Sequence, residues 1–222
     1  ERNASTGALV YGGIIKDGVG GVDGLEGARC VILSSDGKHA YFTGNIDNSV
    51  SWFERNASSG TLTYGGTLKD GQNGVDILDQ PNGMTLSPDG KHCYVTGSAD
   101  NVVSWFERNA STGALSFSGV LKDGENGVDG LHKANDVEVS ADGKYLYVST
   151  GSSSADHSVS WFEINASTGA LSYASSDANY TLTAADAGSV ITVQASYTDG
   201  GTFSENLSSS ATAQVNTLSV FA

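Results

Sequence analysis

Carboxylates recur at equivalent places along this chain, in a spacing that would suit a cation. Asp23, Asp76 and Asp129 occupy the same position in three Gly-Val-Asp segments. Carboxylate and carbonyl oxygens are the ligands that hard cations such as calcium prefer. We therefore take these three residues as candidate binding residues on an acidic rim of loops, with ordinary solvation of Gly-rich loops as the alternative. The sequence does not identify a metal.

A second set of polar residues opens three β-rich segments. Arg29, Asn82 and Asn135 occupy nearly equivalent positions in successive repeats. If each segment is the strand that lines a central tunnel, these side chains gather at the tunnel mouth and can hydrogen-bond a ligand there. We include them among the candidate ligand-binding residues.

Motifs of known catalytic machinery are absent from the sequence. It contains no Gly-x-Ser-x-Gly, no His-Glu-x-x-His and no phosphate-binding glycine loop before a helix. His39 and His92 follow a Gly-Lys turn without an acid or base partner at fixed spacing, so we expect them on the surface. We assign no catalytic residue and no required cofactor, and the sequence leans away from an enzyme.

The charge balance excludes two classes of partner. With 11 Lys and Arg against 25 Asp and Glu, the net charge is −14. Nucleic acids and anionic membrane surfaces need a basic patch, so we expect neither as a partner. No apolar run reaches the ~18 residues that would cross a bilayer, so we expect no membrane insertion. The oligomeric state stays open.

The elements that must position these residues come from an internal repeat. The segment ERNASTGALVYGG begins at residue 1, and variants begin at residues 54, 107 and 163. Within a unit, short β-rich runs alternate with Asp-Gly and Ser-Thr-Gly turns, which predicts a four-stranded antiparallel meander. In the second unit we expect strands at 83–87, 92–96, 102–107 and 114–121. Such sheets in series predict an all-β fold, with each sheet a blade of a β-propeller.

Ring closure needs a further blade beyond these three. The segment 216–222 reads like the strand motif at 47–54, and the motif would continue at residue 1. We therefore expect residues 1–222 to form one four-bladed propeller domain, in which an N-terminal strand at 8–15 completes the blade formed by about 180–222. This arrangement would remove the exposed edge strands. A fragment of a larger propeller is the alternative.

Residues 87–97, SPDGKHCYVTG, and their copies resemble the YVTN-type, lactonase-like repeats of bacterial propellers, over residues 1–173. The resemblance implies a propeller fold and a repeat used both in enzymes and in surface proteins. The openings around Asn82 and Asn135 resemble those of calcium-dependent propeller lactonases, in which the Asn coordinates the metal. Those enzymes also need acidic ligands, and strand alternation would point the nearest candidate, Asp136, away from the side chain of Asn135.

The C-terminal segment has a different resemblance. Residues 180–201 are similar to half of an Ig-like repeat of bacterial surface adhesins. Both resemblances imply an extracellular or cell-surface protein.

Two functions remain open at this stage. Repetition without a unique catalytic constellation favours a non-catalytic, lectin-like or adhesin-like binding module. Its repeated weak sites would gain avidity, with a carbohydrate or cell-surface ligand as partner and calcium as the candidate ion. The alternative is a metal-dependent lactonase or related hydrolase that acts at the central tunnel.

Overall fold

The structure is a computed structural model that describes residues 2–151, 154, 157–173, 194–198 and 204–208. The chain forms two compact units, Glu1–Ser175 and Ser176–Ala222. The described residues contain strands and turns but no helix, so none of them forms a helix that could span a membrane.

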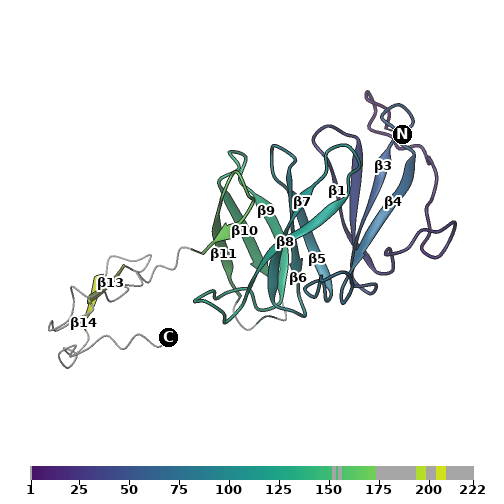
Figure 1. Ribbon diagram of the computed structural model, residues 1–222. Helices are drawn as coiled ribbons and strands as arrows, with labels where there is room; N and C mark the ends of the chain where they lie inside the picture. Colours follow the sequence, from purple (N-terminus) through teal and green to yellow (C-terminus); the bar gives the residue numbers. More distant parts are fainter. Residues whose placement is uncertain (1, 152–153, 155–156, 174–193, 199–203, 209–222) are drawn as a thin grey trace. The chain divides into compact units, whose positions relative to one another are not determined.

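The first unit contains three four-stranded antiparallel sheets, which we call blades one, two and three (Figure 1). Blade one consists of β1 (Ala28–Leu33), β2 (His39–Gly44), β3 (Ser49–Arg55) and β4 (Leu62–Lys69). Blade two consists of β5 (Pro81–Leu86), β6 (His92–Gly97), β7 (Val102–Arg108) and β8 (Leu115–Lys122). Blade three consists of β9 (Ala134–Val139), β10 (Tyr145–Thr150), β11 (Val159–Ile164) and β12 (Leu171–Ser172). The all-β class and the four-stranded blades are confirmed, and the predicted strands of blade two start and end within two residues of those observed.

Short polar side chains build the turns within each blade. Between β5 and β6, the Ser87 hydroxyl donates to Asp89 Oδ1 at 2.6 Å, and the same carboxylate accepts the Lys91 N–H at 3.1 Å. Between β3 and β4, Asn56 Oδ1 accepts the N–H groups of Ser58 and Ser59 at 2.9 and 3.0 Å. These local bonds replace a longer loop, which explains why each turn motif recurs with the repeat.

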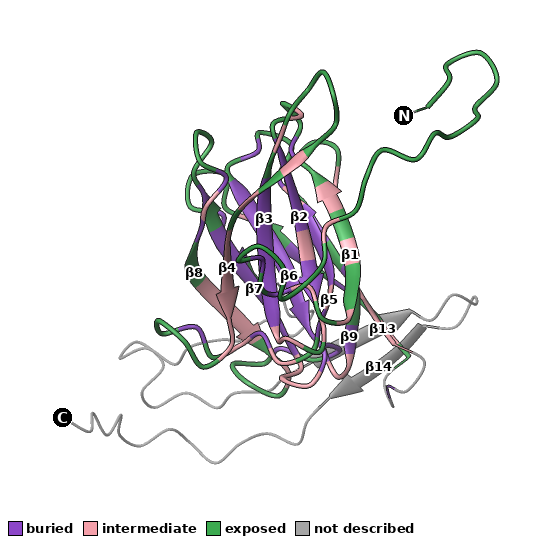
Figure 2. Cartoon of the chain, turned by 90° about the vertical axis from the view of Figure 1, so that its right-hand side faces the viewer, coloured by how far each residue is buried: buried purple, intermediate pink, exposed green. Residues whose placement is uncertain are grey.

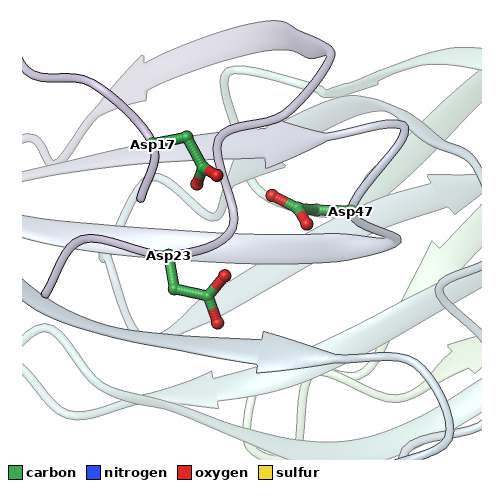
Figure 3. Close-up of side chains that lie close together, drawn as sticks. All are labelled: Asp17, Asp23 and Asp47. Carbon is green, nitrogen blue, oxygen red and sulfur yellow. The ribbon is translucent and has the colours of Figure 1, made fainter. Parts of the chain in front are cut away.

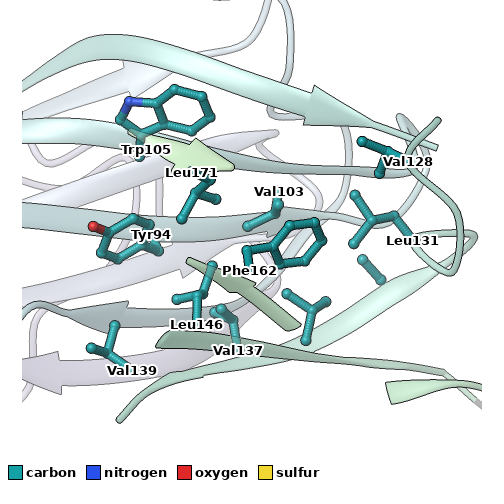
Figure 4. Packing of buried hydrophobic residues seen from close by; sticks show 12 residues of the cluster. Tyr94, Val103, Trp105, Val128, Leu131, Val137, Val139, Leu146, Phe162 and Leu171 are labelled. Carbon is teal, nitrogen blue, oxygen red and sulfur yellow. The ribbon is translucent and has the colours of Figure 1, made fainter. Parts of the chain in front are cut away.

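The core lies between the blades. Tyr41, Val50 and Trp52 of blade one pack with Cys93 and Phe106 of blade two in one buried cluster. The second cluster repeats this pattern one blade later, where blade two packs on blade three (Figure 4). Its members include the equivalent residues Tyr94, Val103, Trp105, Leu146 and Phe162. Blade two is therefore covered on both faces, as the repeat requires.

In the second unit, the described residues form an antiparallel hairpin, β13 (Gln194–Thr198) and β14 (Ser204–Ser208). Most of the predicted adhesin-like segment and of the predicted fourth blade lies outside the described residues. The predicted closing strand at 8–15 is described, and it belongs to no sheet: Leu9 forms an isolated bridge with Arg2, and Tyr11 and Ile14 are exposed. Closure of a four-bladed ring stays a prediction.

Candidate functional site

Repeated carboxylates organise the loops that lead into the blades. We call residues 16–27, 69–80 and 122–133, which precede β1, β5 and β9, the rim loops. In each of them an Asp Oδ1 accepts the N–H of a Leu eight residues later, at 2.8–3.0 Å. The pairs are Asp17 with Leu25, Asp70 with Leu78, and Asp123 with Leu131. Leu78 and Leu131 are fully buried, so these carboxylates fix how the loop enters the core.

A second repeated carboxylate shows how the environment changes from blade to blade. Asp47 Oδ2 accepts the Glu26 N–H at 2.8 Å, and Asp100 Oδ2 accepts the Asp79 N–H at 2.8 Å. Partial burial opposes the ionisation of Asp47, but the Glu26 N–H and the Lys69 ammonium outweigh it and hold its pKa below the ordinary value. Partial burial instead raises the pKa of Asp100. The charges of Asp70 and Asp79 raise it further, and the Asp79 N–H and the charge of Lys122 offset these effects only in part.

The three predicted rim residues have different partners. Asp23 receives the Lys69 ammonium at 2.8 Å, whereas Asp129 Oδ1 accepts the N–H of the following Gly130 at 2.9 Å. Asp76 lines a cavity of about 90 Å³ together with Asp100 and Lys122. All three carboxylates are exposed, and they belong to different local arrangements although they share one repeat position.

One group of carboxylates has the spacing of a metal site. The oxygens of Asp17, Asp23 and Asp47 lie within 4.8 Å of one another (Figure 3), the only such group of acidic, His or Cys side chains among the described residues. The Lys69 ammonium contacts Asp23 at 2.8 Å and Asp47 at 3.2 Å. Its hydrogen bond to Asp23 raises the pKa of Lys69. A cation would have to displace this ammonium, so the donor set fits an ion-pair network better than a calcium cage.

The first strands of the three blades lie side by side. β5 packs against both β1 and β9. At the crossing with β9, a Cβ added to Gly83 would lie 2.6 Å from the Cα of Asp136 and 2.8 Å from its Oδ1. Glycine therefore permits the close approach of the two strands, and the Asp136 carboxylate lies directly over the opening of β5. Asp136 itself is exposed, with its Oδ1 accepting the Val137 N–H at 3.0 Å.

Polar side chains line the openings of these strands. Asn82 Oδ1 accepts a hydrogen bond from Asn45 Nδ2 at 3.0 Å, and the Thr43 hydroxyl donates to the Asn82 carbonyl at 2.9 Å. One blade later, the Thr96 hydroxyl donates to the Asn135 carbonyl at 3.2 Å. The backbone at each opening is therefore fixed by a Thr of the preceding blade, and the Asn135 side chain remains exposed.

We call five polar residues of β1, β5 and β9 the inner row: Arg29, Asn82, Asn135, Asp136 and Glu138. The first four lie at the openings of their strands, and Glu138 lies further along β9. The predicted residues Arg29, Asn82 and Asn135 lie at the same position of adjacent strands, as expected. Sequence reasoning gave Asp136 no role and missed Glu138, whose Oε2 accepts the Thr85 hydroxyl at 3.2 Å. The available signal was their departure from the repeat, since blade two has Gly83 and Thr85 in their places.

The two repeated histidines do not lie on the surface, and that prediction is wrong. His39 and His92 are buried. His39 Nδ1 lies 2.9 Å from a guanidinium nitrogen of the buried Arg108, which also donates to the Tyr41 hydroxyl at 2.6 Å. Burial, and then the charge of Arg108, lowers the pKa of His39. The packing of the next blade over this turn buries the histidines, an effect that turn chemistry alone does not predict.

Comparison with known proteins gives a family for this architecture. The family model described as lactonase, 7-bladed beta-propeller matches residues 19–119 and 80–183. A search of curated proteins found no match.

Solved structures share the fold. A putative 6-phosphogluconolactonase from Bacteroides fragilis is 26% identical, with a TM-score of 0.56, over 68% of this chain and 38% of that protein. The periplasmic gluconolactonase of Pseudomonas aeruginosa is 22% identical, with a TM-score of 0.56, over 66% of this chain and 38% of that protein. This chain therefore spans about two fifths of the length of the structures that it matches.

Proposed function

Because this chain belongs to the lactonase, seven-bladed β-propeller family, we propose that it takes part in the hydrolysis of a sugar lactone. The family match and the similarity to a putative 6-phosphogluconolactonase contradict our expectation of a non-catalytic lectin-like or adhesin-like module, and with it the leaning away from an enzyme. The hydrolase that the sequence left as the alternative is better supported. An extracellular or cell-surface location stays a prediction.

Membership of this family also bears on the number of blades in the ring. We propose that the three described blades form an arc of a larger propeller, which was the alternative reading of the sequence, rather than three quarters of a four-bladed one. The seven-bladed family and the partial coverage of its solved structures support this proposal.

The proposed location of the site rests on the inner row. Its residues are polar and lie on adjacent strands, four of them at the strand openings. Arg29, Asp136 and Glu138 also depart from the repeat. Binding sites need a few polar groups that converge on one place, and the mouth of a β-barrel or propeller is a common location. The rim loops offer more carboxylates, but most of those already bind loop backbone or Lys69.

The inner row supplies groups for each step of ester hydrolysis. We assign Asp136 as the general base that removes a proton from water while the water oxygen forms a bond to the lactone carbonyl carbon. Arg29 would stabilise the negative charge that develops on the carbonyl oxygen. The ring C–O bond then breaks, and the leaving alkoxide takes the proton that Asp136 removed from water, which gives the open hydroxy acid. Asn82 and Asn135 would hydrogen-bond the hydroxyl groups of the sugar.

A calcium ion at Asn82 and Asn135, which the resemblance implied, does not fit the residues present. Asn82 Oδ1 already accepts a hydrogen bond from Asn45. No group of three acidic, His or Cys ligands occurs near these asparagines in the described part of the chain. We therefore derive no step through a metal.

Charge favours a neutral lactone over a phosphorylated one. Among the residues of β1, β5 and β9, Arg29 is the one cation, against the carboxylates Asp136 and Glu138. A phosphate of nearly two negative charges would need more cations than this.

The test is lactone hydrolysis by the purified 222-residue chain, measured by acid release above the spontaneous rate. We expect turnover of D-glucono-δ-lactone and less of its 6-phosphate. Arg29→Met should lower kcat/KM at least tenfold, whereas Arg2→Met, an equal loss of an exposed cation outside the inner row, should leave it unchanged. Equal turnover by the wild type and Arg29→Met would remove Arg29 from the site, and hydrolysis no faster than in buffer would overturn the proposed function.

A further inference from the structure

The outward faces of blades one and three are both apolar and exposed. On blade three the exposed side chains are Tyr147, Val159 and Trp161, and on blade one they are Val31 and Leu33. Figure 2 shows β1 mostly exposed, whereas the inner strands β3 and β6 are mostly buried. Adjacent apolar residues of this size on a sheet face mark an interaction surface.

The repeat shows what kind of surface covers the face of blade three. Trp161 is 59% exposed, whereas the equivalent Trp52 and Trp105 are 9% and 8% exposed because the next blade packs over them. Tyr147 is 44% exposed, whereas its equivalents in blades one and two are fully buried. Within the first unit, blade three therefore leaves exposed the face that the other two blades bury.

The face of blade one is the other half of the same contact. Leu33 is 55% exposed, and Val31 is exposed with it. Their equivalents in blades two and three face the preceding blade, where Met84, Val137 and Val139 are buried. The two outward faces are thus the two complementary sides of one interface, which this chain already forms twice.

Polar groups at this interface repeat as well. The Tyr41 hydroxyl of blade one donates to the Gly113 carbonyl of blade two at 2.9 Å, and the Tyr94 hydroxyl of blade two donates to the Gly169 carbonyl of blade three at 3.1 Å. By the repeat, Tyr147 is the next donor. The next acceptor on blade one is Gly60, where an added Cβ would have no atom within 4 Å.

An arginine completes the pattern on blade one. Across the first interface, Arg108 of blade two donates to the Tyr41 hydroxyl at 2.6 Å while another of its nitrogens donates to the Gly90 carbonyl at 3.0 Å. Arg55 of blade one donates to the Gly37 carbonyl at the same 3.0 Å. Arg55 therefore makes the same contact with its own blade that Arg108 makes while it also reaches a tyrosine of another blade.

We propose that blade three of one copy packs onto blade one of a second copy of this chain. Tyr147 and Trp161 of one copy would then lie against Val31, Leu33 and Arg55 of the other. Two such contacts, related by a two-fold axis, would close a ring of six described blades. Six lies within the four to eight blades with which propellers close, and the contact would cover both outward faces at once.

The experiment tests the oligomeric state and then the head-to-tail pairing. In analytical ultracentrifugation at micromolar concentration we expect the wild-type 222-residue chain to be a dimer. Leu33→Asp and Trp161→Asp should each be mainly monomeric, because each places a charge in both interfaces of the ring. Ile46→Asp, in the turn between β2 and β3 and as exposed as these two residues, should remain a dimer. Far-UV circular dichroism checks that all variants are folded.

Mixing separates this pairing from the alternatives. An equimolar mixture of Leu33→Asp and Trp161→Asp carries one pair of unaltered faces, so we expect a heterodimer to reappear. A dimer that only Trp161→Asp disrupts, without recovery on mixing, would show contact between two copies of blade three and would overturn the proposal. A wild-type monomer would also overturn it. In that case, protection of Trp161 from acrylamide quenching would identify the chain's own C-terminal unit as the occupant.

Discussion

The rim loops and the inner row differ in how far they follow the repeat. In the rim loops, Asp17, Asp70 and Asp123 make the same bond to the same backbone position in three blades. In the inner row, most equivalent positions hold different residues, such as Cys30, Gly83 and Asp136, and Asn82 and Asn135 are the exception. A bond that every blade needs is retained in every blade, whereas a single reaction needs one copy of each group. Repetition therefore marks the scaffold, and departures from it mark the candidate site.

The largest effect that separates the two regions should come from Asp136. Asp136→Asn removes the proposed general base and should lower kcat/KM for D-glucono-δ-lactone by roughly 100-fold or more. Asp129→Asn, which neutralises an exposed carboxylate of a rim loop, is the matched control and should leave kcat/KM within twofold. If the two variants lost activity equally, the distinction between the rim and the inner row would fail.

The reverse experiment changes a rim loop and measures stability in place of activity. Asp70→Ala leaves the N–H of the buried Leu78 without its acceptor and should reduce the free energy of unfolding by about 1–3 kcal/mol. Asp76→Ala, an exposed position in the same loop, should change it by less than about 0.5 kcal/mol. Urea unfolding measures both values. A stability of Asp70→Ala equal to that of Asp76→Ala would contradict the structural role of the repeated carboxylates.

Much of this difference between the rim loops and the inner row could be predicted from the sequence. The repeat predicted the blades, the strands and the positions of Arg29, Asn82 and Asn135, because turn residues and strand alternation act locally. The burial of His39 was not predictable, since it depends on Arg108 and on the packing of blade two over that turn. The role of Lys69 was equally hidden, because two loops of one blade must come together before it can contact Asp23 and Asp47.

A smaller effect distinguishes by pH two equivalent carboxylates that bind the backbone of the rim loops, Asp47 and Asp100. The pKa of Asp47 is lowered in the folded state, so its charge stabilises the fold above the ordinary pKa of 3.8, and this contribution disappears as pH falls through the lowered value. The pKa of Asp100 is raised, so its charge costs stability at neutral pH, and the cost disappears as pH falls through the raised value toward 3.8.

Asn substitutions should therefore have opposite signs. At pH 7, Asp47→Asn should lower the unfolding free energy and Asp100→Asn should raise it, each by less than about 1.5 kcal/mol. Both differences should shrink below pH 4. Chemical unfolding at pH 7, 5 and 3.5 measures them, and the same sign for both variants at pH 7 would refute the assigned role of Lys69.

The smallest effect concerns calcium. Because Lys69 contacts two of the three clustered carboxylates, the wild type should gain no more in melting temperature from millimolar calcium chloride than from sodium chloride at matched ionic strength. Lys69→Ala leaves those carboxylates to a cation and should show a saturable calcium-specific rise. A calcium-specific rise in the wild type that Asp23→Asn abolishes would restore the predicted rim site.

The central claim is that a lactone binds at the inner row and not on the rim. Backbone amide NMR of the 222-residue chain tests it directly, with titration of a slowly hydrolysed δ-lactam analogue of gluconolactone. We predict saturable shifts at Arg29, Asn82, Asn135 and Asp136, with the amides of Leu25, Leu78 and Leu131 unchanged. Shifts confined to the rim loops, or none at millimolar analogue, would contradict the account.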